Sequence, residues 1–295
     1  MRYDPHEILV SPARPSASLH LLLAGMILTI LVCWGLNYFF WMVVFALLPN
    51  ELSTSLTATL ENARTPGGVV ISLCLFALLS VALAVSLRIL HQRGVMSLIG
   101  PLPLALYQFR RVIFALVLLF AVTSFLPLPD GLTPTENLDF GRWLGLLPLA
   151  LFGLLIQTSA EELAFRGYLQ SQLAAQFRHP LIWIGVPSLL FGLLHYDSSL
   201  PSTNALIIVL WATFFGLAAA DLTARSGTLG PAIALHMVNN FSAIAFAAPE
   251  GAFDGLALYT FPFSLASSDA LITWAPIDLL LLLCSWLTAR LALRR

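Results

Sequence analysis

Long apolar runs separated by short polar segments make up most of the chain. A helix needs about 20 apolar residues to cross the hydrocarbon core of a bilayer. Eight runs approach or exceed this length, and segments such as PNELSTS, PLPDGLTPTEN and DSSLPST interrupt them. The pattern predicts an all-α polytopic membrane protein with helices at 20–48, 68–90, 110–128, 143–176, 180–196, 203–224, 229–248 and 270–292.

The first 20 residues, MRYDPHEILVSPARPSASLH, are polar and contain prolines, unlike the run that follows them. That run is longer than the roughly 7–15 apolar residues of a signal-peptide core. It therefore predicts a first transmembrane helix rather than a cleaved signal. We expect a cytoplasmic tail at residues 1–19 and a single eight-helix transmembrane domain at residues 20–295.

Composition supports the membrane assignment. Hydrophobic residues make up 59% of the 295 residues, charged residues only 10%, and the mean hydropathy is +0.88. Soluble domains carry about 25% charged residues, so a soluble fold is excluded. The net charge of −1 and the absence of a basic cluster in the sequence argue against a nucleic-acid partner.

The arginines predict the orientation. If the N-terminus is cytoplasmic, the outer loops hold only Arg64 and Arg142, and Arg166 lies within a span. Eleven arginines then fall in inner segments: Arg2, Arg14, Arg88, Arg93, Arg110, Arg111, Arg178, Arg225, Arg290, Arg294 and Arg295. The positive-inside rule therefore favours an even number of spans with both termini cytoplasmic.

The motif EELAFR, from Glu161 to Arg166, places charges inside an apolar helix, where they are costly unless they pair or act. Glu162 and Arg166 are four residues apart, glutamate first, which favours an ion pair on one helix face. Glu161 points about 100° away and has no local partner. An unpaired carboxyl in such a site suits a general base or acid, so Glu161 is the catalytic candidate.

Two further motifs, FGLLH (191–195) and HMVNN (236–240), place a histidine in each of two other helices. Phe191 shares a helix face with His195, and His236 shares one with Asn240. Glu161 and His195 both lie 17 residues from Arg178, so a helical hairpin centred there would bring them to the same depth. We expect the three motifs to meet in one intramembrane cavity on the cytoplasmic side.

Each motif alone also has a structural interpretation, as an ion pair that links helices or as a hydrogen-bonded interior histidine. Taken together they favour function, because a bundle rarely buries so many polar groups without a use for them. Asp221 and Arg225 are expected to form a surface ion pair. Asp278 follows Pro276 in the last helix and is expected to line a cavity or to cap backbone groups freed by the proline.

The motifs exclude several hydrolase types. The sequence has no HExxH zinc motif, no serine in a glycine-rich turn at membrane depth, and no aspartate pair near the histidines. Two chemistries remain for one glutamate with two histidines. Glu161, His195 and His236 would be a metal site, or Glu161 would activate water directly while His and Asn side chains stabilise an oxyanion.

The order Glu-Glu-x-x-x-Arg, Phe-x-x-x-His, His-x-x-x-Asn, each in its own helix, resembles the CAAX-protease and bacteriocin-processing (CPBP, or Abi) family. That family includes the type II CAAX prenyl endopeptidases. The contexts EELAFRGYLQ and GTLGPAIALHMVNN are also similar, and the resemblance covers residues 141–248. It implies an intramembrane protease of the glutamate type, a hydrolase with its protease-like core at 141–248.

The resemblance also implies the roles of the site residues. Glu161 would activate the attacking water, assisted by His195, and His236 with Asn240 would hold the oxyanion. Glu162, Arg166 and Phe191 would support this site. No cofactor is expected, and a tightly bound metal is not favoured.

The resemblance leaves the substrate open, and we expect a membrane-anchored protein or peptide, cleaved in a bacterial inner membrane. Two other functions remain as alternatives. One is a non-catalytic immunity or scaffold protein that binds a peptide in the same cavity. The other is a proton-coupled transporter, since Glu and His in a bundle also form proton relays.

Overall fold

The computed structural model describes residues 3–251 and 253–294, so Arg2 and Arg295 of the arginine count lie outside the described residues. The fold is 78% helical, which confirms the predicted all-α class. Six helices of the described chain are long and apolar enough to cross a membrane. They span Leu19–Leu47, Pro66–His91, Leu102–Thr123, Phe140–Gln176, Ser202–Ser226 and Ser268–Leu293. The protein is therefore an integral membrane protein.

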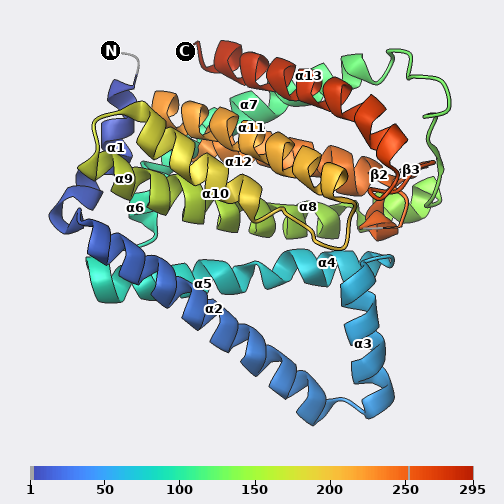
Figure 1. Cartoon of the computed structure of the whole chain (residues 1–295), viewed down its shortest axis with the longest axis horizontal. Coiled ribbons are helices and arrows are strands. Elements are labelled where there is room, and N and C mark those ends of the chain that lie inside the picture. Colours follow the sequence, from blue (N-terminus) through green and yellow to red (C-terminus); the bar gives the residue numbers. More distant parts are fainter. Residues whose placement is uncertain (1–2, 252, 295) are drawn as a thin grey trace.

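The helices that come before the first strand form the N-terminal half of the fold (Figure 1). Three short elements precede the first long helix and pack into the bundle. In chain order the half consists of η1 (Asp4–His6), α1 (Glu7–Val10), η2 (Ser11–Ser16), α2 (Leu19–Leu47), α3 (Asn50–Asn62), α4 (Pro66–Leu75), α5 (Ala77–Ser86), η3 (Leu87–His91), α6 (Met96–Ile99) and α7 (Leu102–Thr123).

The C-terminal half contains the three motifs and a small sheet. Its helices are α8 (Phe140–Glu162), η4 (Leu163–Gln170), α9 (Ser171–Gln176), η5 (Leu181–Gly185), α10 (Val186–Leu193), α11 (Ser202–Ser226), α12 (Gly230–Asn240), η6 (Phe241–Phe246), η7 (Asp254–Leu256) and α13 (Ser268–Leu293). The sheet order is β1-β3-β2, with β1 antiparallel and β2 parallel to β3. Its strands are β1 (Thr135–Glu136), β2 (Ala247–Pro249) and β3 (Tyr259–Phe261). Strands this short carry no alternating pattern, and the sequence did not predict them.

The predicted number of eight spans is approximate. Every predicted span contains a helix, but two of these helices are shorter than a membrane crossing requires. The helix predicted at 180–196 covers Leu181–Leu193, because it ends just before the polar segment YDSSLPS. The helix predicted at 229–248 is α12 with η6, and it ends at Phe246 where strand β2 begins.

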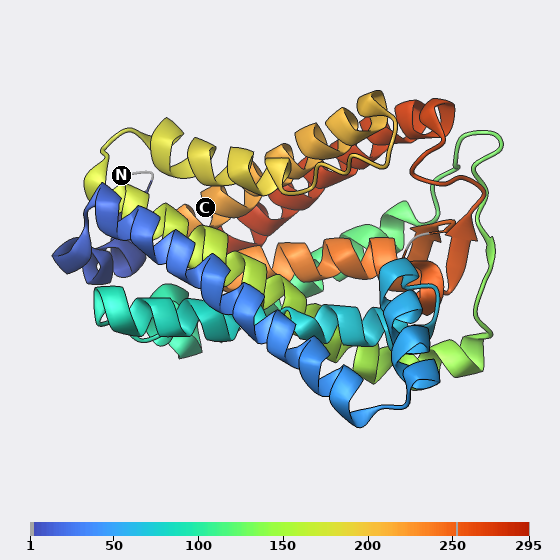
Figure 2. The same ribbon diagram turned by 60° about the horizontal axis from the view of Figure 1, so that its bottom comes forward.

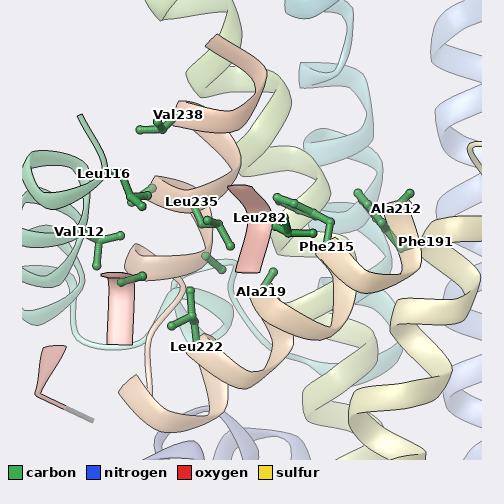
Figure 3. Packing of buried hydrophobic residues seen from close by; sticks show 13 residues of the cluster. Val112, Leu116, Phe191, Ala212, Phe215, Ala219, Leu222, Leu235, Val238 and Leu282 are labelled. Carbon is green, nitrogen blue, oxygen red and sulfur yellow. The ribbon is translucent and has the colours of Figure 1, made fainter. Parts of the chain in front are cut away.

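The main hydrophobic core lies where α7, α10, α11, α12 and α13 pack together (Figure 3). Phe191 of α10 and Phe215 of α11 stack at the edge of this core, with ring centroids 5.9 Å apart. Both rings are almost fully buried. They form an apolar wall beside the motif residues of α8 and α12.

Helix α2 leaves the bundle. In Figure 1 it crosses α5 near its N-terminal end and then diverges, with α3 closing the gap to α4. Figure 2 shows α2 running diagonally across the front of the bundle, with α3 at its far end. The Gly25 carbonyl accepts a hydrogen bond from Ser86 Oγ at 2.9 Å, at the crossing. A Cβ at Gly25 would run into the hydroxyl of Tyr168. The crossing therefore depends on a residue without a side chain.

Candidate active site

The first motif lies in a continuous helix made of α8, η4 and α9, from Phe140 to Gln176. Asp139 caps its start, because its carboxylate accepts a hydrogen bond from the Arg142 backbone N–H at 3.0 Å. The helix is α-helical through Glu162 and becomes a π-helix at Leu163. Helix α12 likewise changes to the π-helix η6 directly after Asn240. π-Helical turns are rare and are often found at functional sites.

Glu162 and Arg166 form a fully buried ion pair. Arg166 Nη1 lies 3.1 Å from Glu162 Oε1, and both side chains are 0% exposed. The i,i+4 pair predicted from the sequence is thereby confirmed. The guanidinium also lies over the Phe191 ring, 4.5 Å from its centroid, which adds a cation–π contact. An ion pair this deep is stable only if its partners stay in place.

His236 of α12 reaches both glutamates of the motif. Its Nδ1 lies 2.8 Å from Glu162 Oε1, and its Nε2 lies 3.5 Å from Glu161 Oε2. Since Glu162 Oε1 already accepts from Arg166, it acts as a carboxylate acceptor for the histidine as well. The proton of the neutral imidazole therefore belongs on Nδ1, and Nε2 is left facing Glu161.

The formal charges of the two glutamates and the arginine do not balance. Glu161 and Glu162 contribute two negative charges, and Arg166 contributes one positive charge. Burying the remaining negative charge is costly. Glu161 Oε2 is enclosed and has no hydrogen-bond partner among the described residues. This oxygen faces His236 Nε2 at 3.5 Å, so a carboxyl group and an imidazole nitrogen lie side by side in an enclosed site.

Asn240 joins the site through a residue that the sequence reasoning missed. Its Nδ2 donates to Oε1 of Gln157 at 2.9 Å, and its Oδ1 accepts from Asn239 Nδ2 at 3.3 Å. Gln157 is buried and stands four residues before Glu161, on the same face of α8. A buried amide one turn before a catalytic candidate is a signal that could have identified it.

His195 lies at the edge of the site. It is exposed and stands in the turn after α10, where its Nδ1 contacts the Phe191 carbonyl oxygen at 2.8 Å. The Phe191 ring lies 4.7 Å from the His195 ring and 6.0 Å from the His236 ring. Phe191 thus connects the second motif to the third. Among the described residues, the hydrogen bonds and ring contacts of His195 do not extend to Glu161 or His236.

The region that contains these residues was compared with known proteins. Residues 143–242 match a family described as type II CAAX prenyl endopeptidase Rce1-like, and this range contains all three motifs. The matched region is thus similar to the Rce1-like family. This confirms the resemblance that the three motifs predicted.

A relative of the chain has been found among curated proteins. It is the uncharacterized protein YyaK of Bacillus subtilis (strain 168), which is 30% identical over 172 residues. The match covers 56% of this chain and 56% of the relative, so the chain spans about half the length of the curated relative that it matches. No solved structure matches the chain.

The region that matches the Rce1-like family does not assemble the alternative metal site. Among residues 3–251 and 253–294, no group of three or more His, Cys, Asp or Glu side chains is placed to hold a metal ion. Glu161 and His236 approach each other, but His195 is held against Phe191 instead. The donor set of Glu161, His195 and His236 therefore does not fit a metal in this arrangement.

The ion pair of Asp221 and Arg225 was expected at the surface, but the structure buries it. The pair exists at 2.7 Å, but its side chains are only 10% and 8% exposed. Tyr3 Oη donates to Asp221 Oδ1 at 2.8 Å, and Trp286 Nε1 donates to Oδ2 at 3.0 Å. The N-terminal segment and α13 cover the pair, which a helical pattern alone does not show.

Proposed function

We propose that the protein is an intramembrane endopeptidase that hydrolyses a peptide bond in a membrane-associated protein or peptide. The observation that carries the proposal is the enclosed Glu161 Oε2 at 3.5 Å from His236 Nε2. Such a pair can take a proton from water and return it to a leaving amine. The match of residues 143–242 to the Rce1-like family supports a protease of the CAAX type.

In the proposed reaction Glu161 removes a proton from water as the water oxygen attacks the carbonyl carbon of the substrate. The carbonyl oxygen becomes an oxyanion that accepts a hydrogen bond from Asn240. When the intermediate collapses, the C–N bond breaks and the proton passes from Glu161 to the leaving nitrogen. His236 exchanges this proton with Glu161 through its Nε2.

The other motif residues hold these groups in place. Glu162 and Arg166 fix the tautomer of His236 through its Nδ1. Because both ring nitrogens of His236 face carboxylates, we assign it to proton transfer rather than to the oxyanion. His195 has its Nδ1 against the Phe191 carbonyl, which leaves Nε2 to orient water or the incoming substrate.

The proposal places the enzyme in a bacterial inner membrane, with both termini cytoplasmic and a membrane-anchored substrate. It includes no metal or other cofactor. We therefore expect cleavage by purified protein in lipid vesicles to be unchanged after treatment with EDTA or 1,10-phenanthroline. Loss of cleavage that returns on addition of Zn²⁺ would contradict this part of the proposal.

The test compares the membrane proteomes of cells that carry native protein, Glu161→Gln or the control Glu51→Gln. Glu51 is an exposed glutamate of α3 and is distant in sequence from the motifs. We expect at least one membrane protein to accumulate at a larger mass with Glu161→Gln alone. This precursor is then the substrate.

Two other outcomes would identify the alternative functions. If no protein changes in mass and Glu161→Gln still rescues the phenotype of a gene deletion, the motif residues bind a peptide without cleaving it. If Glu161→Gln instead abolishes gradient-dependent uptake, the protein is a transporter. Either result overturns the proposed hydrolysis.

A further inference from the structure

Three side-chain amides form a directed chain beside the proposed catalytic pair. Asn239 Nδ2 donates to Asn240 Oδ1 at 3.3 Å, and Asn240 Nδ2 donates to Gln157 Oε1 at 2.9 Å. In this arrangement Asn240 presents its oxygen to Asn239 and its nitrogen to Gln157. The two bonds tie the orientations of the three amides to one another, and in either direction along the chain Gln157 and Asn240 each keep at least one further N–H.

The hydrogen-bonded chain of amides leaves N–H groups free at Asn240 and Gln157. The Asn240 amide nitrogen carries two hydrogens, and only one is used on Gln157. The Gln157 Nε2 makes no hydrogen bond within residues 3–251 and 253–294. Some polar side-chain atoms are both enclosed and without a partner, among them Glu161 Oε2 and Glu162 Oε2, but Gln157 Nε2 is not one of them. The Gln157 amide nitrogen is therefore in contact with accessible space, although the residue is only 5% exposed.

The position of Gln157 relative to the base suits a substrate carbonyl. Gln157 precedes Glu161 by four residues, so the two side chains lie on one face of α8, about 6 Å apart along the axis. A carbonyl oxygen attacked by water on Glu161 would lie within reach of donors on this face. His236 does not supply them, because its ring nitrogens face Glu162 and Glu161.

We infer that Gln157 and Asn240 act as a pair of amides that binds the oxyanion, each donating one N–H to the carbonyl oxygen under attack. As the C=O electron pair moves onto that oxygen, the two N–H groups stabilise the charge and keep their protons. Gln157 has a second effect, because its Oε1 holds Asn240 in the donating orientation. The inference rests on the proposed function and adds Gln157 to it.

The experiment measures kcat and KM in lipid vesicles, with the precursor that accumulates in Glu161→Gln cells as the probe. Gln157→Met keeps the volume of the side chain and removes both the donor and the acceptor. We expect kcat to fall roughly 100-fold, while KM changes less than about threefold. Gln157→Asn retracts the amide by one methylene, and we expect it to lower kcat in the same way if Gln157→Met does not fold.

A matched control separates this role from simple burial. Gln172 is a buried glutamine of the same continuous helix, and its Nε2 bonds Ser16 and His91 instead. Gln172→Met is expected to lower the melting temperature with kcat within about threefold of native. A folded Gln157→Met or Gln157→Asn enzyme with a kcat within threefold of native overturns the inference.

The double variant Gln157→Met/Asn240→Ala tests whether the amides act as a unit. If they do, the double variant is within about threefold of Asn240→Ala alone, because each depends on the other. If the losses in kcat of the two single variants multiply to roughly 10⁴-fold in the double variant, the two residues act independently, and the inference of a paired action is overturned. If the native protein converts no precursor at all, the proposed function fails, and the inference fails with it.

Discussion

Helix α2 and the continuous helix of α8, η4 and α9 both have membrane-spanning length, but they are stabilised in different ways. In its most apolar window α2 is 17% buried and the α8–α9 helix is 33% buried. Between Leu19 and Leu47 the α2 sequence has no Asp, Glu, Lys or Arg, whereas the other helix contains Glu161, Glu162 and Arg166. The comparison shows that an apolar helix needs few protein contacts in a membrane, while a charged one needs partners from other helices.

The largest effect is expected where the charged helix depends most on its partners. Arg166→Met leaves Glu162 buried beside His236 without its cation, and breaking such a pair costs about 3–5 kcal/mol. We expect a much lower melting temperature in detergent and a smaller folded fraction by gel filtration. Adding Glu162→Gln should restore part of the stability. If Arg166→Met melts like the native protein, the ion pair does not stabilise this helix.

The next effect concerns the N-terminal segment, which joins the start of α2 to the charged helix. The His6 ring is 3% exposed and packs against Trp183, and burial lowers the pKa of His6 from 6.5 to about 4. Unfolded His6 binds a proton between these values and folded His6 does not. The stability from His6 is therefore present above pH 6.5 and lost as the pH falls through about 4, by roughly 3 kcal/mol in all.

Melting curves between pH 7 and pH 4 measure this effect. His6→Gln should flatten the pH dependence, and His20→Gln, at an exposed histidine of α2, should leave it as in the native protein. An unchanged slope in His6→Gln contradicts the assignment to His6.

A smaller effect is expected where α2 crosses the bundle. A Cβ at Gly25 would clash with Tyr168 Oη and lie 3.1 Å from His91 Nε2, whereas one at Gly35 would meet nothing within 4 Å. Gly25→Ala should cost about 1–3 kcal/mol by overpacking. Gly35→Ala, in the same helix, should leave the melting temperature unchanged or slightly higher. Equal melting temperatures for the two variants would show that α2 does not dock through Gly25.

The smallest effect is expected on the exposed face of α2. Trp34 is 72% exposed, so Trp34→Leu removes a lipid-facing side chain and few protein contacts. We expect both precursor conversion and the melting temperature to stay close to the native values. A loss of activity above tenfold would mean that this face of α2 contacts the substrate.

The sequence predicted those parts of the structure that depend on short-range spacing. Apolar runs located the helices, and the four-residue interval predicted the pair of Glu162 with Arg166. Counting residues along the helices also predicted that the three motifs meet. Those of α8 and α12 do so through His236, whereas His195 lies against Phe191. These features follow from helix periodicity and from the pairing that buried charges require.

Other features depend on contacts between distant segments. Asp221 is buried by Tyr3 and Trp286, which come from opposite ends of the chain. Both ring nitrogens of His236 face carboxylates because α12 packs against α8. Gln157 became a candidate site residue only because Asn240 of α12 donates a hydrogen bond to it. A pattern along one helix cannot show which side chain a second helix brings to it.

The π-helix η4 has a consequence for the alignment of related sequences. A π-turn takes about one residue more than an α-turn, so the α-helical equivalent of Leu163–Gln170 would contain fewer residues. A relative with that change would keep the letters EELAFR and show a single-residue gap before the position of Gln172. Alignments that forbid a gap there would rotate every later residue of the helix by about 100°, and would compare side chains that face different neighbours.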